Sequence, residues 1–241
     1  MVAWWPLNET SGNPVMDVAG GHLGTAQPGA IGSNVPPGPV PSTLWPPPSF
    51  PLGVVGGSHF FSGTRRIEVP HSPMLEPGIG DFSVDAWVIF AAAGTGQDLT
   101  IVRKVSPSQP GYKFIIGDHP SPSLPTLSFE TLGPIAGYNV NWPIAPNLWH
   151  HVAATLQRGV TTQTVDLYVN GTLVIHYVGP NLGNIANSSN LLIGGDGIAA
   201  GQIALDEIEI FNRALSQAEL QAIYQARSYG KCAIPPPPRT P

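Results

Sequence analysis

Acidic residues are concentrated near the C-terminal end of the chain, between Leu205 and Ile210. If this segment forms a strand, Glu207 and Glu209 lie on one face with their Cα atoms about 6.5–7 Å apart. Such a pair could carry out acid–base chemistry on a glycosidic bond, because inverting glycosidases separate their carboxyl groups by about 6.5–9.5 Å. The simpler interpretation, in which two glutamates occupy a solvated strand face, is favoured.

Asp206 differs from these glutamates, because alternation along the same strand places it with Ala204, Ile208 and Ile210 on an apolar face. A carboxylate on an apolar face needs either a cation or several hydrogen bonds. Calcium takes oxygen ligands from carboxylates and loop carbonyls, so Asp206 is a candidate ligand of a structural calcium ion. The alternative is a carboxylate that accepts hydrogen bonds from backbone N–H groups in a turn.

Two adjacent histidines, His150 and His151, suggest a metal site at first sight. Neighbours on a strand point to opposite faces, so both cannot bind one ion. His150 shares a face with Val152 and Ala154, which indicates a core histidine. No His/Cys cluster has zinc spacing, and the chain has neither a Gly-x-Ser-x-Gly elbow nor a phosphate loop. The sequence therefore predicts no catalytic site.

Aromatic residues in loops or at strand ends are the best candidates for ligand recognition. Sugars present C–H faces that stack on such rings, while nearby carboxylates and amides bind the hydroxyl groups. The aromatic candidates are Trp45, Tyr112, Tyr138 and Trp142, and the polar candidates are Asp98, Asp118 and Asn141. For any single aromatic residue, the alternative that it covers a loop or plugs an end of the fold is favoured.

Composition points to short strands and many loops. The 241-residue chain is 42% hydrophobic and only 10% charged, with 28 glycines and 28 prolines, which favours an all-β domain with a core of its own. The net charge of −5, with no basic cluster larger than Arg65-Arg66, argues against binding of nucleic acid or anionic lipid. Cys232 is the only cysteine, which excludes an intramolecular disulfide.

Neither a signal peptide nor a membrane span is apparent. After Met1 the chain begins with Val2-Ala3-Trp4-Trp5, and polar residues follow soon afterwards, which is not the pattern of a signal peptide. The longest apolar run, residues 86–93, is far shorter than the ~18 residues of a membrane helix. We therefore expect no membrane insertion, and either a module of a larger secreted protein or a protein that needs no such signal.

Strand patterns recur along the chain. In residues 82–90, Phe82, Val84, Ala86 and Val88 would face the core, with Asp85 and Trp87 on the other face. Asn170-Gly171 predicts a tight hairpin between two apolar runs. Further strands are expected at residues 2–7, 99–104, 112–116 and 126–132.

One helix is predicted, from a capping box at Ser216–Glu219 to about Arg227. The Pro-rich segment 28–52 is expected to be a long surface loop within one domain of residues 1–231. Residues 232–241, with four consecutive prolines, are expected to form a tail or linker.

Several short stretches, in their order along the chain, resemble the laminin G-like, concanavalin A-like lectin/glucanase family. They are residues 4–12 (WWPLNETSG) with Asp17, 59–63 (HFFSG), 67–70 (IEVP), 81–88 (DFSVDAWV), 148–155 (LWHHVAAT), 166–171 (DLYVNG), 192–195 (LIGG) and 203–215. The resemblance implies a two-sheet antiparallel jelly-roll sandwich, one sheet being concave, with one short C-terminal helix.

The resemblance also implies a bound calcium ion, with Asp17 joining Asp206 as its ligand and with Asp81 and Glu9 as weaker candidates. Glucanases of this fold carry a Glu-x-Asp-x-(x)-Glu strand, and Ala204 occupies the position of their nucleophile here. The fold alone implies no single function.

Together, these observations predict a non-catalytic recognition module, extracellular or on a cell surface. It would bind glycan through its concave face or rim loops and hold a structural calcium ion. The alternative is a structural subunit of a virion or an extracellular fibre, which would use the sandwich to assemble with other proteins. A glycoside hydrolase is least favoured, since it would depend on Glu207 and Glu209 alone.

Overall fold

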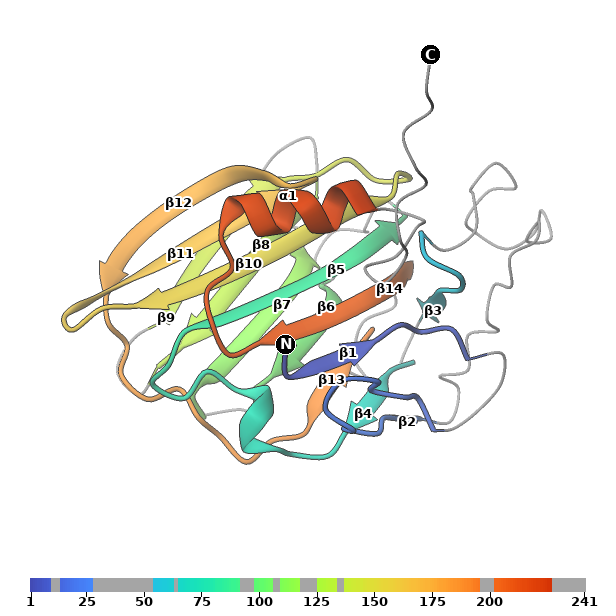
Figure 1. The fold of residues 1–241 in the computed structure, drawn as a ribbon, viewed down its shortest axis with the longest axis horizontal. Coiled ribbons are helices and arrows are strands. Elements are labelled where there is room, and N and C mark those ends of the chain that lie inside the picture. The colour runs from blue at the N-terminus through green and yellow to red at the C-terminus, as the bar shows by residue number, and fades with distance from the viewer. Residues whose placement is uncertain are drawn as a thin grey trace, which may run out of the picture.

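In a computed structural model, the described part of the protein consists mainly of two antiparallel sheets and one α-helix. The structure describes residues 1–9, 14–27, 54–62, 65–91, 98–105, 109–117, 125–133, 137–195 and 202–226. The sheets stack face to face, and the helix lies across the outer face of one of them (Figure 1). The predicted all-β sandwich with one C-terminal helix is therefore confirmed.

The sheet beneath the helix, called here the helix-side sheet, has seven strands in the described part of the chain. Its order is β1-β14-β5-β10-β11-β12, with β3 also paired to β14. The strands are β1 (Ala3–Trp5), β3 (His59–Ser62), β5 (Phe82–Phe90), β10 (His150–Arg158), β11 (Thr162–Val169), β12 (Thr172–Pro180) and β14 (Gln202–Phe211).

The opposing sheet, called here the second sheet, also has seven described strands, in the order β2-β4-β13-β6-β7-β8-β9. They are β2 (Thr25–Ala26), β4 (Ile67–Val69), β6 (Leu99–Lys104), β7 (Gly111–Gly117), β8 (Thr126–Leu132), β9 (Gly137–Pro143) and β13 (Leu191–Ile193). A short 3-10 helix, η1 (Pro73–Leu75), precedes β5.

The core lies between the sheets and is built from alternate strand residues, as the period of two requires. In β5, Phe82, Val84, Ala86 and Val88 belong to the main core, as predicted. Asp85 and Trp87 point the other way and are nevertheless buried, because the outer face of this sheet is also covered.

Local sequence signals explain the hairpin and the helix. Asn170 and Gly171 have φ values of 54° and 74°, as the tight turn between β11 and β12 requires. The helix α1 (Gln217–Ala226) begins at the predicted capping box, where Glu219 accepts a hydrogen bond from the Ser216 backbone at 2.9 Å. Leu215 and Leu220 then pack this helix onto the sheet.

Candidate functional site

A bulge in β14 rearranges the acidic segment. Between Asp206 and Glu209, β14 gains one residue relative to β5, and Glu207 adopts a left-handed φ of 52°. Asp206 therefore lies opposite Trp87, on the side away from the main core, whereas Ile208 lies in the core. The prediction that Asp206 shares a face with Ile208 is wrong, because the bulge reverses the alternation.

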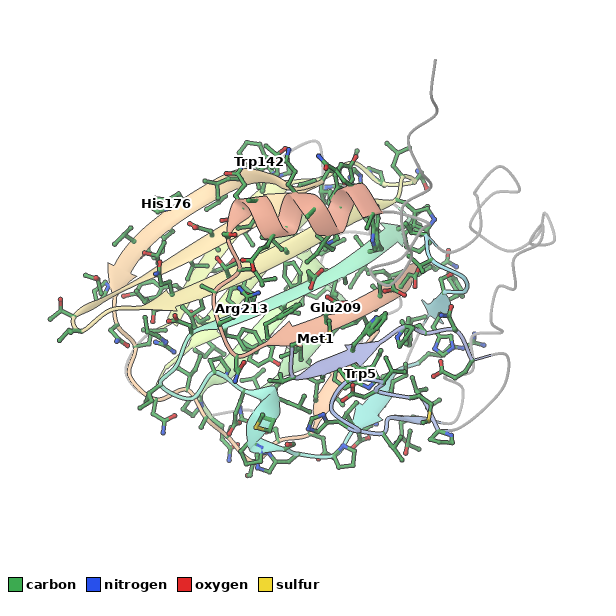
Figure 2. All side chains as sticks on the ribbon, viewed as in Figure 1. Met1, Trp5, Trp142, His176, Glu209 and Arg213 are labelled. Atoms are coloured by element: carbon green, nitrogen blue, oxygen red, sulfur yellow. The ribbon has the colours of Figure 1, made fainter. Side chains whose placement is uncertain are left out.

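The acidic residues of β14 are buried, and this burial corrects the interpretation of a solvated strand face. Asp206, Glu207 and Glu209 are at most 3% exposed. The Trp4 indole donates a hydrogen bond to Glu207 Oε2 at 3.0 Å, and Glu209 projects from β14 opposite Asp85 (Figure 2). A sugar could not contact Glu207 or Glu209 without a large local rearrangement. We therefore assign this pair no role in catalysis.

Burial raises the pKa of Asp206 well above its ordinary value, although a hydrogen bond from the Val55 N–H to Oδ2, at 2.9 Å, acts in the opposite direction. Its other carboxylate oxygen, Oδ1, is buried and has no hydrogen-bond partner among the described residues. This oxygen is the one feature of Asp206 that would suit a cation ligand. In the parts of the chain that the structure describes, no three His, Cys, Asp or Glu residues are grouped to hold a metal.

Both carboxylate oxygens of Asp17 accept hydrogen bonds from the surrounding chain. Its Oδ1 accepts hydrogen bonds from the backbone N–H groups of Trp4, Ala19 and Gly20 at 2.8–2.9 Å. Its Oδ2 accepts one from the His22 N–H at 3.0 Å and lies 2.7 Å from His22 Nδ1. These donors carry partial positive charge toward the carboxylate and occupy the positions that a cation would need.

The weaker calcium candidates also serve the backbone. Asp81 accepts a hydrogen bond from the Arg158 N–H at 2.7 Å, and Glu9 accepts one from the Met16 N–H at 2.7 Å. The Asp81 contact connects segments far apart in sequence, whereas the Glu9 contact is local. The calcium ion itself stays a prediction.

The two histidines occupy opposite faces of β10, as expected. His150 lies on the core side, and its Nε2 is 3.1 Å from the Ala145 carbonyl oxygen. His151 lies on the outer face beneath α1, where its Nε2 is 2.9 Å from Asp85 Oδ2. Its ring also contacts Trp87, with the centroids 5.4 Å apart.

The proposed aromatic residues do not form one site. Tyr112 is fully buried and donates a hydrogen bond to the Leu75 carbonyl at 2.9 Å, so its prediction as an exposed ligand-binding residue is wrong. Tyr138 lies on β9 and packs against Tyr177 of β12, with ring centroids 5.2 Å apart. Trp142, on the same strand β9, is 39% exposed and lies at the periphery of the sandwich (Figure 2).

The polar candidates are also dispersed. Asn141 is exposed on β9, and Asp98 is half-buried immediately before β6. Trp45 and Asp118 lie outside the described residues, as do the Pro-rich segment 28–52 and the tail 232–241.

A row of polar side chains crosses the outer face of the second sheet, and sequence reasoning did not identify it. Direct cross-strand pairing connects Arg103 of β6 to Lys113 of β7, Lys113 to Glu130 of β8, and Glu130 to Asn139 of β9. We call Arg103, Lys113, Glu130 and Asn139 the polar row. Their strand neighbours on the opposite face belong to the core, so the polar row points away from it.

Charge pairing orders the polar row. Lys113 Nζ lies 2.9 Å from Glu130 Oε2, and Asn139 Nδ2 donates a hydrogen bond to Glu130 Oε1 at 3.4 Å. All of the polar row except Asn139 is half-buried, so its side chains are held close to the sheet surface. Adjacent donors and acceptors in fixed positions can bind a ligand that offers both kinds of group.

Alternation within each predicted strand would have placed Arg103, Lys113 and Glu130 on the outer face of the sheet, away from the core. The order of the strands in the sheet, which makes them neighbours, has no signal in the sequence.

The described residues contain no helix long and apolar enough to cross a membrane.

Comparisons with known proteins agree on the fold. Residues 61–221 match the laminin G-like model of the concanavalin A-like lectin/glucanases superfamily. A comparison with curated protein sequences finds no match.

Similar solved structures include the binding domain of Paraclostridial Mosquitocidal Protein 1, at 15% identity and a TM-score of 0.65 over 93% of this chain and 52% of that chain. The botulinum neurotoxin type G receptor binding domain is similar at 14% identity and a TM-score of 0.62, over 93% and 50% of the two chains. The botulinum neurotoxin serotype D binding domain matches at 14% identity and a TM-score of 0.65, again over 93% and 50%.

The chain therefore spans about half the length of these solved chains, and at such identities the likeness concerns the fold. The family match covers more than half of the sequence and includes β5, β14 and the start of α1. The chain belongs to the laminin G-like family of the concanavalin A-like lectin/glucanase superfamily.

Proposed function

We propose that this domain is a non-catalytic recognition module that binds glycan on the outer face of the second sheet. The observation that carries the proposal is the difference between the two outer faces. The helix α1 packs on the helix-side sheet through Leu215 and Leu220, whereas the second sheet presents the polar row. A ligand that binds a sheet face would therefore use the second sheet.

The chemistry of this face suits a sugar. The hydroxyl groups of a sugar donate and accept hydrogen bonds, and the polar row offers cationic donors, a carboxylate acceptor and an amide within a few strands. Asn141 lies on β9 on the same face as Asn139, so it adds a second exposed amide to this surface. The similar solved structures are themselves named as receptor or toxin binding domains, which supports a recognition role.

A surface or extracellular location and a structural calcium ion belong to the same proposal. Asp206 is the candidate ligand that supports it best, because its buried Oδ1 has no hydrogen-bond partner in the part of the chain that the structure describes. The residues around Asp17 do not support it as the second ligand, since backbone donors surround that carboxylate.

A second candidate function, assembly of a virion or extracellular fibre, is favoured by the free edge of the helix-side sheet. In the described part of the chain, β12 pairs only with β11. It exposes Leu173 and Val178, which are 37% and 54% exposed. An apolar edge strand with unpaired backbone groups can add a strand from another protein.

A glycan array distinguishes the two functions. We expect the purified domain to bind one class of glycan, and Glu130→Ala or Lys113→Ala to weaken that binding about tenfold or more, because each removes a charged hydrogen-bonding group of the polar row. Ile79→Ala is the control, since Ile79 is 75% exposed and belongs to neither surface.

The array should be run with calcium and again with EDTA. Loss of binding in EDTA would support the calcium ion. Absence of binding on a broad array by a folded domain would reject the glycan proposal and favour assembly, which a Val178→Lys variant would then disrupt.

A further inference from the structure

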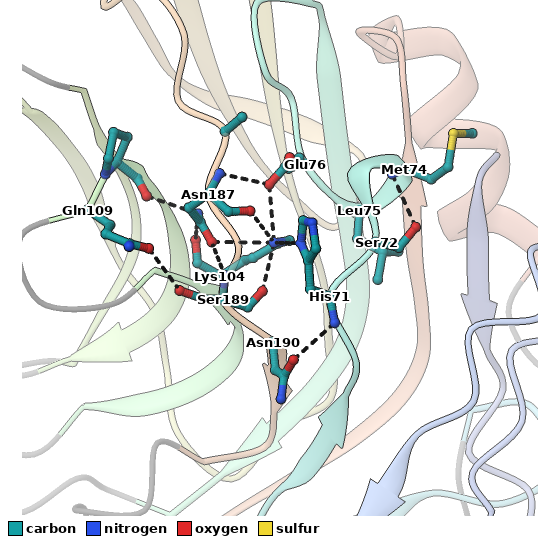
Figure 3. Close-up of polar contacts among 12 residues, drawn as sticks. His71, Ser72, Met74, Leu75, Glu76, Lys104, Gln109, Asn187, Ser189 and Asn190 are labelled. Atoms are coloured by element: carbon teal, nitrogen blue, oxygen red, sulfur yellow. Dashed lines mark hydrogen bonds and ion pairs between the residues drawn. The ribbon is translucent and has the colours of Figure 1, made fainter.

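Lys104, at the end of β6, has a completely buried ammonium group. Its Nζ lies 3.1 Å from Glu76 Oε2 and 3.0 Å from His71 Nδ1 (Figure 3). It also donates to the Ser189 carbonyl at 2.7 Å and to the side-chain carbonyl Oδ1 of Asn187 at 3.3 Å. The amine thus meets two proton acceptors and one amide at a single point between three separate segments.

The surroundings of Lys104 favour the neutral amine more than water does. Burial lowers the pKa of Lys104, and the hydrogen bond and charge of Glu76 oppose this effect only in part. His71 Nδ1 and the Glu76 carboxylate are both within hydrogen-bonding distance of Nζ, so either can accept its proton. A buried, deprotonated lysine amine is a nucleophile.

The side-chain amide of Asn187 is held in one orientation beside this amine. Its Nδ2 donates to the backbone carbonyls of Lys104 at 3.0 Å and Pro110 at 2.9 Å, which fixes Oδ1 toward Nζ. Oδ1 also accepts a hydrogen bond from the Ser189 N–H at 2.8 Å. Donors at Oδ1 polarise the carbonyl and would stabilise the oxyanion of a tetrahedral intermediate.

Gly111 allows the side chain of Asn187 to approach the backbone of Lys104 closely. A Cβ atom on Gly111 would lie 2.8 Å from Asn187 Nδ2 and 2.1 Å from the Lys104 carbonyl oxygen. Only glycine leaves space for the amide between β6 and β7.

We propose that Lys104 and Asn187 join through an intramolecular isopeptide bond. The neutral amine of Lys104 attacks Asn187 Cγ, which is one carbonyl bond, about 1.2 Å, from the Oδ1 that it already contacts, and Nζ gives one of its two protons to His71 or Glu76 as the new bond forms. The new Nζ–Cγ bond replaces the Cγ–Nδ2 bond. Nδ2 leaves as ammonia after receiving the displaced proton, so atoms and charge balance without an oxidant or a cofactor.

The bond would tie β6 to the segment between β12 and β13, which contains Asn187. This segment has no strand or helix of its own between Pro180 and Leu191. A covalent link there would restrain the end of the sandwich at which η1 also docks, through Glu76 and the Asn187 N–H at 3.0 Å. This function is independent of the proposed glycan binding.

Intact-mass spectrometry of the wild-type domain tests the proposal directly. After purification and incubation under native conditions, we expect a mass below the sequence mass by one ammonia, about 17 Da. A protease digest should contain a branched peptide that joins Lys104 to Asn187. An unchanged mass, or a gain of about 1 Da from simple hydrolysis of the amide, would overturn the proposal.

Variants identify the participating groups. Lys104→Arg removes the nucleophile but keeps a cation, and Glu76→Gln removes one proton acceptor but keeps a hydrogen-bonding side chain. We expect Lys104→Arg to retain the full sequence mass and Glu76→Gln to lose ammonia more slowly. Lys113→Arg is the matched control, because Lys113 pairs with Glu130 on the sheet surface, and it should lose ammonia as the wild type does.

Discussion

His151→Ala is expected to lower the free energy of unfolding by about 3–5 kcal/mol, because it removes the buried partner of a carboxylate and leaves that carboxylate behind. His151 Nε2 lies 2.9 Å from Asp85 Oδ2, and both side chains are 1% exposed. Asp85 faces Glu209 across the β5–β14 ladder, so the histidine lies beside two buried acidic residues. The change further removes the ring that packs on Trp87.

Urea unfolding of the variant beside His176→Ala measures this effect. His176 Nδ1 lies 2.7 Å from Asp166 Oδ1, a shorter distance than that of the buried pair, but its side chain is 58% exposed. Water screens the exposed pair, so its loss should cost less than about 1 kcal/mol. Equal losses for the two variants would contradict the role assigned to burial.

Asp17→Ala is expected to destabilise the domain by about 3 kcal/mol or more, because a hydrogen bond to a charged group typically contributes about 1.5–3 kcal/mol and Asp17 accepts several. The lost contacts join β1, through the Trp4 N–H, to the turn that contains Gly20 and His22. Asp17→Asn keeps one carbonyl oxygen as a hydrogen-bond acceptor and should lose less stability than Asp17→Ala. Thermal unfolding of the wild type and the two variants measures the order of their stabilities.

The pH dependence of the same proteins provides a second readout. Burial acts to raise the pKa of Asp17, but the hydrogen bonds from Gly20, Trp4 and His22 outweigh it and lower the pKa from its ordinary 3.8. The contribution of Asp17 is therefore complete well above pH 3.8 and is lost as the pH falls through the lowered value of the folded state. Asp17→Asn should lose less stability over this acidic range than the wild type.

EDTA separates this account from the calcium prediction. If backbone donors alone stabilise Asp17, the melting temperature of the wild type stays the same in calcium and in EDTA. A lower melting temperature of the wild type in EDTA, with no such difference for Asp17→Ala, would instead support Asp17 as a calcium ligand.

Strand patterns predicted much of the fold, because alternation in residues 82–90 and the Asn170-Gly171 turn depend on local chemistry. The β14 bulge was missed because its left-handed position holds Glu207 rather than the usual glycine or asparagine. Tyr112 was misplaced because its hydroxyl group satisfies the Leu75 carbonyl inside the core, a contact between distant segments that no spacing predicts.

The candidate site was harder to predict than the fold for a similar reason. The polar row depends on which strands are neighbours, and the Lys104 cluster joins β6, η1 and the segment before β13. Sequence analysis identified single exposed aromatic residues, of which Trp142 is exposed in the structure. Long-range packing decides which side chains meet.

The position of β14 has a consequence for how the chain folds. β14 is the last of the described strands along the chain, yet it lies inside the helix-side sheet between β1 and β5. The first strand, β1, can join this sheet only through residues about two hundred positions later in the sequence. Such non-local pairing carries a large loop-closure entropy, so folding should be slow. During synthesis, β1 therefore stays without its partner strand until β14 has left the ribosome.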